Sequence, residues 1–239
     1  MNITNTEVNG FYHAVKGIRN NRNTWDKSDS IRDNGEYIIG KDDFKLMCKL
    51  AIAGNAHSKF MRYITVYCDI EAPIYWWKEF DTYKVGTVRN STSTMNTIMN
   101  KEFELSDFEN IESPSLVNSF NDIINSLNNY RSMYLDIKSR LANDMPKDEM
   151  IAMQQEQKEI WYSIIKLLPS SYKQTSTILM NYQVLRHIYF DRKDHKLNEW
   201  HIFCDWIKTL PDSEIITCTS VDETLKNKYT ESSSFSHYL

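Results

Sequence analysis

The sequence predicts an α+β protein, a single domain in which long helices pack on a small antiparallel sheet. Three observations indicate this class: two long segments with apolar residues at helical spacing, two short segments rich in aromatic and β-branched residues, and a composition with 41% hydrophobic and 25% charged residues. A chain of 239 residues is long enough to bury a hydrophobic core. We expect the domain to cover residues 1–210 and a polar, mobile tail to cover 211–239.

The N-terminal part is polar and rich in asparagine, with one short helix expected around residues 11–18. A second helix is expected to follow Asp42 and Asp43, which resemble an N-terminal cap, and to stop at Gly54. Residues 62–70 alternate between polar and apolar, which predicts a strand. Its apolar face would carry Ile64, Val66, Cys68 and Ile70.

The middle of the chain combines an aromatic helix, a polar loop and a helical hairpin. Pro73 can open a helix at its first turn, and the apolar run 74–77 follows it. Residues 84–94 are full of Ser, Thr and Asn, which is typical of a loop. Apolar stripes predict helices over 115–141 and 147–168, joined by a turn at 143–146 into an antiparallel pair.

The C-terminal part repeats the order of strand and helix. Residues 172–180 are rich in Tyr, Thr and Ile, and predict a second strand. Apolar spacing then predicts a helix through 184–189 and a last helix over 197–210, closed by Pro211.

Composition excludes several classes of function. The six glycines are scattered and form neither a GxGxxG nor a P-loop motif. The net charge of -4 argues against a dedicated nucleic-acid binder, which needs a basic face. The four cysteines form no CxxC pair and the histidines no HExxH motif, so we expect no metal site. No apolar run is long enough to span a membrane and the N-terminus resembles no secretory signal, so we expect a cytoplasmic protein with no membrane partner.

Three segments hold more polar chemistry than packing requires. Residues 55–62 connect a helix to a strand and are basic, residues 79–94 are rich in hydroxyls and amides, and residues 186–195 are rich in Arg, His and Asp. Hydroxyls, amides and guanidinium groups suit the binding of a polar ligand. Each segment also has a plainer interpretation, as a connecting loop, a solvated loop or a solvated turn with a helix cap.

Taken in order, these segments resemble the flavin-dependent (alternative) thymidylate synthases over residues 11–209. The resemblance rests on a His/Ser turn before a strand, then Ala72-Pro73-Ile74 and an aromatic helix, the polar loop, the hairpin, Leu168-Pro169, a strand, Asn181 and Arg192. In that family an AP-aromatic segment leads into an RHRxxS motif that holds FAD, and a following loop holds dUMP.

The resemblance implies a role for each matching position. Arg192 would be the catalytic residue that orients the pyrimidine of the nucleotide. The FAD cofactor would be held by His57, Ser58, Lys84, Thr87 and Asn181. The nucleotide would be held by Glu79, Arg89, Asn90, Ser91, Thr92, Ser93 and Arg192.

The chain also departs from the family pattern. Thr82-Tyr83-Lys84-Val85-Gly86-Thr87 stands where the family has RHRxxS. In the dUMP loop the acidic, serine and arginine positions hold Asn90, Thr92 and Thr94, and Ile165 replaces a further arginine. Each charge-assisted hydrogen bond to a phosphate contributes about 1.5–3 kcal/mol, so these losses argue against efficient dUMP methylation.

Two functions follow from the resemblance and its departures. The first is a nucleotide-binding protein of nucleotide metabolism, with flavin-dependent methylation of a pyrimidine nucleotide as its activity. The alternative is a non-catalytic phage or mobile-element protein that binds and sequesters a nucleotide or a nucleotide-derived signal; a relative with no small ligand is a third. The family further implies a homotetramer, for which the interface candidates are Tyr63, Tyr67, Trp76 and Trp77; these residues could equally fill a monomer core.

Overall fold

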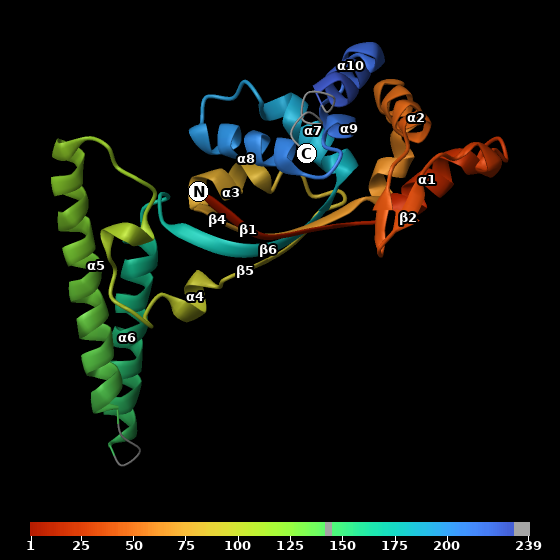
Figure 1. Ribbon diagram of the computed structural model, residues 1–239. Helices are drawn as coiled ribbons and strands as arrows, with labels where there is room; N and C mark the ends of the chain where they lie inside the picture. The colour runs from red at the N-terminus through yellow and green to blue at the C-terminus, as the bar shows by residue number, and fades with distance from the viewer. Residues whose placement is uncertain (142–144, 232–239) are drawn as a thin grey trace. The chain divides into compact units, whose positions relative to one another are not determined.

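The computed structural model describes residues 1–141 and 145–231 (Figure 1). The chain forms two compact units. Unit 1 comprises Met1 and residues 71–80 and 91–176, and unit 2 comprises residues 2–70, 81–90 and the chain from 177 onward. Neither unit ends at residue 210, where the sequence suggests a domain boundary.

A four-stranded sheet has the order β1-β4-β6-β5, and its strands are β1 (Asn2–Asn9), β4 (Thr65–Pro73), β5 (Val88–Ser91) and β6 (Lys173–Asn181). Strands β4, β5 and β6 each pass from one unit into the other. The alternation predicted in β4 is confirmed, because Ile64, Val66, Cys68 and Ile70 are all buried. The polar strand β1 was not expected, and β5 corrects the prediction of a loop throughout 84–94.

Unit 1 is built around the predicted helical hairpin, α5 (Pro114–Arg140) and α6 (Lys147–Leu167). The two helices run side by side in Figure 1 and share a core of Ile124, Leu127 and Ile164. The turn predicted at 143–146 lies partly outside the described residues. Two short helices complete the unit, α3 (Ile74–Phe80) and α4 (Thr94–Thr97).

Unit 2 holds the remaining helices and a small hairpin of β2 (Ile31–Asp33) and β3 (Glu36–Ile38), paired antiparallel. Its helices are α1 (Phe11–Asn20), α2 (Lys41–Ile52), α7 (Tyr182–Arg192), α8 (Asn198–Thr209), α9 (Glu214–Thr217) and α10 (Val221–Glu231). Large fully buried side chains from these elements form its core: Phe44, Met47, Met61, Tyr182, Trp200 and Phe203.

The start of α2 differs from the sequence prediction. Its N-cap is Gly40, and the carboxylate of Asp29 accepts hydrogen bonds from the backbone N–H groups of Asp42 (2.8 Å) and Asp43 (3.0 Å). The cap therefore comes from a distant residue. The side chain of Asp43 instead points into the core, where it pairs with Arg19 at 2.6 Å.

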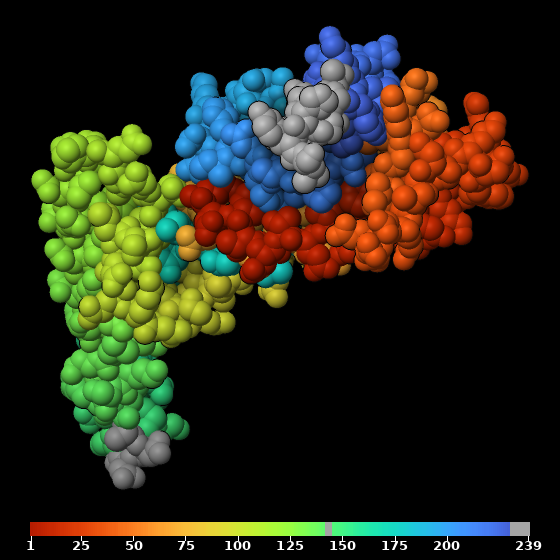
Figure 2. Space-filling model, in the orientation of Figure 1, coloured from red at the N-terminus to blue at the C-terminus, as the bar shows by residue number. Residues whose placement is uncertain are grey.

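The segment expected to be a mobile tail contains two helices, α9 and α10. Ile215 and Ile216 are fully buried because they supply the apolar face that α9 turns to the core. The ring of Tyr229 on α10 meets the ring of Phe44 on α2 with their centroids 6.2 Å apart, and Figure 2 shows the blue C-terminal segment beside the orange segment that contains α2. Residues 232–239, the rest of the expected tail, lie outside the described residues.

The described residues form neither a membrane-spanning helix nor a cluster of metal ligands. None of its helices combines the length and the hydropathy that crossing a membrane requires. Within residues 1–141 and 145–231, His, Cys, Asp and Glu side chains form no group that could hold a metal ion.

Candidate functional site

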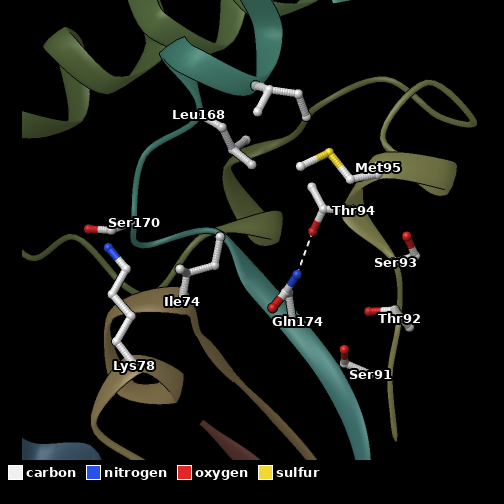
Figure 3. A pocket seen from close by; sticks show the side chains of 11 residues that line it. Ile74, Lys78, Ser91, Thr92, Ser93, Thr94, Met95, Leu168, Ser170 and Gln174 are labelled. Atoms are coloured by element: carbon white, nitrogen blue, oxygen red, sulfur yellow. Dashed lines mark hydrogen bonds between the residues drawn. The ribbon is translucent and has the colours of Figure 1, made fainter. Parts of the chain in front are cut away.

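Unit 1 contains a cavity of about 490 Å³, which is in the range that small-molecule sites occupy (Figure 3). Four segments meet around it: α3, the segment from the end of β5 into α4, the end of α6 with the residues after it, and the start of β6. The lining residues are Ile74, Lys78, Ser91, Thr92, Ser93, Thr94, Met95, Ile165, Leu168, Ser170 and Gln174.

The hydroxyl-rich wall of this cavity is held in place by hydrogen bonds. The backbone N–H of Thr92 donates to the carbonyl oxygen of Thr175 at 2.9 Å, which extends the pairing of β5 with β6. The amide of Gln174 donates to the hydroxyl of Thr94 (Figure 3). The wall is therefore an ordered edge of the sheet, although its composition is typical of a loop.

Backbone contacts also fix α3 against the other side of the cavity. The N–H of Ile74 donates to the carbonyl of Tyr172 and that of Tyr75 to the carbonyl of Ser170, both at 3.0 Å. The indole of Trp77 donates to the carbonyl of Gln174 at 3.1 Å. Lys78 and Gln174 thus come together because α3 is anchored to the start of β6.

The cavity presents two different chemistries. Ile74, Met95, Ile165 and Leu168 contribute apolar side chains, residues 91–94 contribute hydroxyls, and Ser170 and Lys78 lie on the other side from these hydroxyls in Figure 3. Among the described lining residues, Lys78 is the one with a charged side chain. Such a site can bind a ligand that joins a flat apolar group to an anionic group, since hydroxyls and an ammonium group donate to anionic oxygens.

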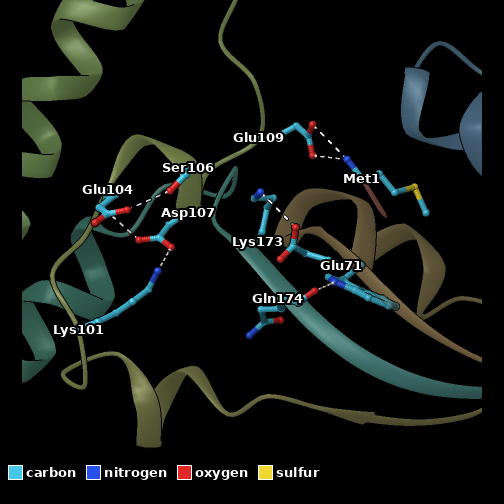
Figure 4. Close-up of polar contacts among 10 residues, drawn as sticks. Met1, Glu71, Lys101, Glu104, Ser106, Asp107, Glu109, Lys173 and Gln174 are labelled. Carbon is cyan, nitrogen blue, oxygen red and sulfur yellow. Dashed lines mark hydrogen bonds and ion pairs between the residues drawn. The ribbon is translucent and has the colours of Figure 1, made fainter. Parts of the chain in front are cut away.

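Acidic residues close to the cavity in sequence are paired elsewhere in unit 1 (Figure 4). Glu71 accepts from Lys173 at 3.2 Å, and Glu109 binds the N-terminal ammonium of Met1 at 3.0 Å. Asp107 pairs with Lys101, and this hydrogen bond raises the pKa of the Lys101 ammonium. Each of these three carboxylates therefore has a cationic partner, which reduces its repulsion of an anionic ligand in unit 1.

Three residues predicted to bind a nucleotide, Ser91, Thr92 and Ser93, line the cavity. Glu79 lies on α3 next to Lys78 but is not a lining residue. Sequence reasoning missed Lys78 and Gln174. No local signal marks either of them, because only the anchoring of α3 to β6 brings them to the hydroxyl segment.

Arg192, the predicted catalytic residue, lies in unit 2 at the end of α7. Its Nε donates to the hydroxyl of Tyr83 at 2.8 Å, and its guanidinium lies 4.8 Å from the ring centre of Trp200. The Tyr83 hydroxyl donates to Asp191 at 3.3 Å. Burial raises the pKa of Tyr83 although the Arg192 cation opposes this effect, so Tyr83 is a neutral partner that orients the guanidinium.

The residues around the replaced RHRxxS motif pack against the start of α7. Gly86 has φ +83, and a Cβ there would lie 3.0 Å from Asn181 and from Val184. The carboxamide oxygen of Asn181 caps α7 by accepting from the N–H of Val184 at 3.0 Å. Lys84 is exposed, and the buried hydroxyl of Thr87 has no hydrogen-bond partner among the described residues.

The other predicted residues of unit 2 are dispersed. Ser58 is buried and its hydroxyl accepts from Gln183 at 3.2 Å, whereas His57 is exposed beside a different cavity of about 420 Å³. Arg89 pairs with Asp81 at 2.9 Å, and Asn90 is exposed. Within unit 1 the structure therefore brings Ser91, Thr92 and Ser93 to one cavity, and within unit 2 it places Arg192 among Tyr83 and Trp200.

Comparison with known proteins identifies the fold. No protein-family model matches the sequence, and no curated protein matches it either. Two solved structures of the flavin-dependent thymidylate synthase ThyX from Helicobacter pylori, both with FAD and dUMP, are similar to this chain. The first is 18% identical with a TM-score of 0.62 and covers 90% of this chain and 96% of its own. The second is 18% identical with a TM-score of 0.63 and covers 95% and 99%.

The chain has the ThyX-like fold. The UMP/dUMP methylase PolB from Streptomyces cacaoi, bound with 5-Br dUMP, is also similar, with 14% identity, a TM-score of 0.50 and coverage of 90% of this chain and 95% of its own. The α+β class and the resemblance expected from the order of the motifs are thereby confirmed.

Proposed function

We propose that this protein binds a pyrimidine nucleotide in the cavity of unit 1 and acts in nucleotide metabolism. The observation that carries the proposal is the lining of that cavity, which combines apolar side chains, a row of hydroxyls and the cationic Lys78. A base can lie on the apolar side chains while its phosphate accepts from the hydroxyls and from Lys78. The similar proteins, ThyX and PolB, were solved with pyrimidine nucleotides, which supports this class of ligand.

The first test is a calorimetric titration of the purified protein with dUMP, the nucleotide in the ThyX structures. Lys78→Met should weaken binding roughly ten-fold, because a charge-assisted hydrogen bond contributes at least about 1.5 kcal/mol. Lys166→Met is the matched control, since Lys166 is an exposed lysine at the end of α6 that does not line the cavity. Equal affinities for all three proteins would contradict the assignment of the phosphate to Lys78.

A second titration separates the phosphate from the base. Deoxyuridine lacks the phosphate, so its weaker binding should be the same in the wild type and in Lys78→Met. Thr92→Val removes a lining hydroxyl and keeps the shape of the side chain, and it should weaken dUMP binding without unfolding the protein. Absence of dUMP binding in the wild type would refute the proposal.

Flavin-dependent methylation is the activity that the fold favours, with FAD as its cofactor. The described residues assigned to FAD fit it poorly within unit 2. The oxygens of Ser58 and Asn181 take part in internal hydrogen bonds, and the hydroxyl of Thr87 is the one buried polar atom of this set without a partner among the described residues. We therefore derive no reaction step through FAD. An absorbance spectrum of the purified protein, with mass spectrometry of what denaturation releases, tests this activity directly.

The alternative is a non-catalytic protein that sequesters a nucleotide or a nucleotide-derived signal. The contacts of Arg192 favour this alternative. The guanidinium that would orient a pyrimidine in the enzyme donates to Tyr83 and lies over the ring of Trp200 in this chain. A colourless protein that releases a nucleotide on denaturation would support capture, and released FAD would support the enzyme. The homotetramer stays a prediction, which sedimentation of the purified protein would measure.

A further inference from the structure

Unit 2 contains two buried thiols that the proposed function does not use. Cys48 lies on α2 and is fully buried, and Cys218 follows α9 with an exposed fraction of 3%. They are 170 residues apart in sequence, yet the Sγ of Cys218 lies 3.9 Å from the carbonyl oxygen of Cys48. The Cys218 thiol also lies 3.5 Å from the carbonyl oxygen of Ile215. The sulfur of Cys218 therefore lies against the residue that carries the second buried thiol.

A guanidinium group is fixed beside this pair. Nη1 of Arg186 donates to the carbonyl oxygens of Ile216 at 2.6 Å and Cys218 at 3.0 Å, and it lies 3.9 Å from the Sγ of Cys218. The neighbouring Cys48 and the Arg186 cation lower the pKa of Cys218 to about 7, against the opposing effect of burial. The same contact raises the pKa of Cys48. One thiol is thus favoured as a thiolate, which is the nucleophilic form.

The other two cysteines show what burial does without such surroundings. Burial raises the pKa of Cys68 to about 12 and that of Cys204 to about 11. Both are therefore thiols at neutral pH and poor nucleophiles. They provide an internal reference for any reaction at Cys218.

We propose that Cys48 and Cys218 form an oxidisable dithiol site that takes a hydroperoxide and closes to a disulfide between α2 and the segment that leads into α10. This inference goes beyond the proposed function and does not depend on a ligand in the cavity of unit 1. Three observations carry it: the approach of the Cys218 sulfur to the backbone of Cys48, the burial of both thiols, and the neighbouring Arg186.

The reaction has two balanced steps. The Cys218 thiolate attacks one oxygen of hydrogen peroxide, so that an S–O bond forms, the O–O bond breaks and hydroxide leaves, which takes a proton to become water. The sulfur of Cys48 then attacks the sulfenic sulfur of Cys218, so that the S–S bond forms, the S–O bond breaks, and the hydroxyl leaves as water with the proton of Cys48. Two thiols lose two electrons and one peroxide becomes two molecules of water.

The position of the site determines how fast it reacts and what closure does. Because both sulfurs are buried, the oxidant reaches them when the segment around Cys218 opens locally. That segment leads into α10, which already contacts α2 through Tyr229 and Phe44. A disulfide would make this contact permanent and should slow proteolysis within α10.

The test uses the full chain treated with hydrogen peroxide, quenched, denatured, alkylated and digested without reductant. We expect a pair of peptides joined through Cys48 and Cys218. The reduced chain has four free thiols, and the oxidised chain should keep only those of Cys68 and Cys204, which are alkylated. In Cys48→Ser, Cys218 should stop at a sulfenic acid that dimedone traps, and in Cys218→Ser no disulfide should form. Arg186→Lys should slow the reaction while keeping a positive charge near the sulfur.

Several results would overturn the proposal. One is a protein that keeps all its thiols under peroxide while a cysteine-containing reference peptide in the same reaction is oxidised. Another is pairing that involves Cys68 or Cys204 as often as Cys48 and Cys218. Should Cys218→Ser fail to fold, as judged by circular dichroism, Cys218→Ala replaces it, and the peptide map of the wild type decides the outcome without either variant.

Discussion

The buried ion pair between Arg19 and Asp43 should contribute measurably to the stability of unit 2. Asp43 is fully buried, and its carboxylate accepts from Arg19 Nε at 2.7 Å, from the Ser28 hydroxyl at 2.5 Å and from the Ser30 hydroxyl at 2.7 Å. Arg19→Met keeps the apolar stem and removes the cation, which leaves a buried carboxylate with its serine donors alone. Breaking a buried pair in this way costs about 3–5 kcal/mol. Because the serine hydroxyls still donate, we expect a loss near the lower end, about 3 kcal/mol.

The assay is urea unfolding at neutral pH, followed by circular dichroism, with a matched pair in the same unit as control. Lys208 and Asp205 pair at 2.9 Å on α8 but are largely exposed, so Lys208→Met should cost at most about 0.5 kcal/mol. In the double variant Arg19→Met with Asp43→Asn, no charge is left unpaired. We therefore expect it to be more stable than Arg19→Met alone.

The reasoning would be refuted by either of two results. One is an Arg19→Met variant whose loss of unfolding free energy matches that of Lys208→Met. The other is a double variant no more stable than Arg19→Met alone, since this would mean that the carboxylate of Asp43 is not left uncompensated when Arg19 is removed. An unchanged dependence on urea concentration across the series would show that all variants unfold in the same transition.

Three further predictions concern pH, the aromatic cluster and a glycine. Burial alone would raise the pKa of Asp43, but its hydrogen bonds outweigh burial and lower that pKa below its usual range. Its stabilisation is therefore complete above about pH 4, the usual range of an unfolded Asp, and is lost as the pH falls through the folded pKa, so acid titration of Asp43→Asn should show a shallower loss. Tyr83→Phe removes the hydroxyl that accepts from Arg192 and should cost about 1 kcal/mol of unfolding free energy, and dUMP affinity should stay unchanged if the nucleotide lies in unit 1 alone. Gly10→Ala should destabilise strongly, because φ is +104 and the new Cβ would lie 1.9 Å from a backbone oxygen, whereas Gly35→Ala, with φ +90 and open space, should cost about 1 kcal/mol in thermal unfolding.

Most of the fold could be predicted from sequence because its helices carry their own pattern. The hairpin α5–α6 shows apolar residues at helical spacing, and β4 shows strict alternation, so both are visible without tertiary information. Strand β1 was missed because NITNTEVN is polar, and β5 because VRNS is polar and short. Both lie at the edges of the sheet, where neighbours far away in sequence determine the structure and side-chain pattern says little.

The site was less predictable than the fold. The hydroxyl composition of residues 91–93 suggested a ligand, and these residues line the cavity. Lys78 and Gln174 carry no such signal, because the anchoring of α3 to β6 is a matter of backbone hydrogen bonds. The role of Asp43 was misjudged for a similar reason, since its partner Arg19 lies 24 residues earlier in the chain.

The path of the chain between its two units limits how this protein can be divided or varied. Residues 71–80 and 91–176 belong to one unit and are separated by residues 81–90 of the other. No single cut can release either unit, so a truncated fragment would remove parts of both. The helices α5 and α6, in contrast, lie wholly inside one uninterrupted stretch of unit 1. Whole turns could therefore be added or removed where α5 ends and α6 begins. Such a change would leave the register of every strand as it is.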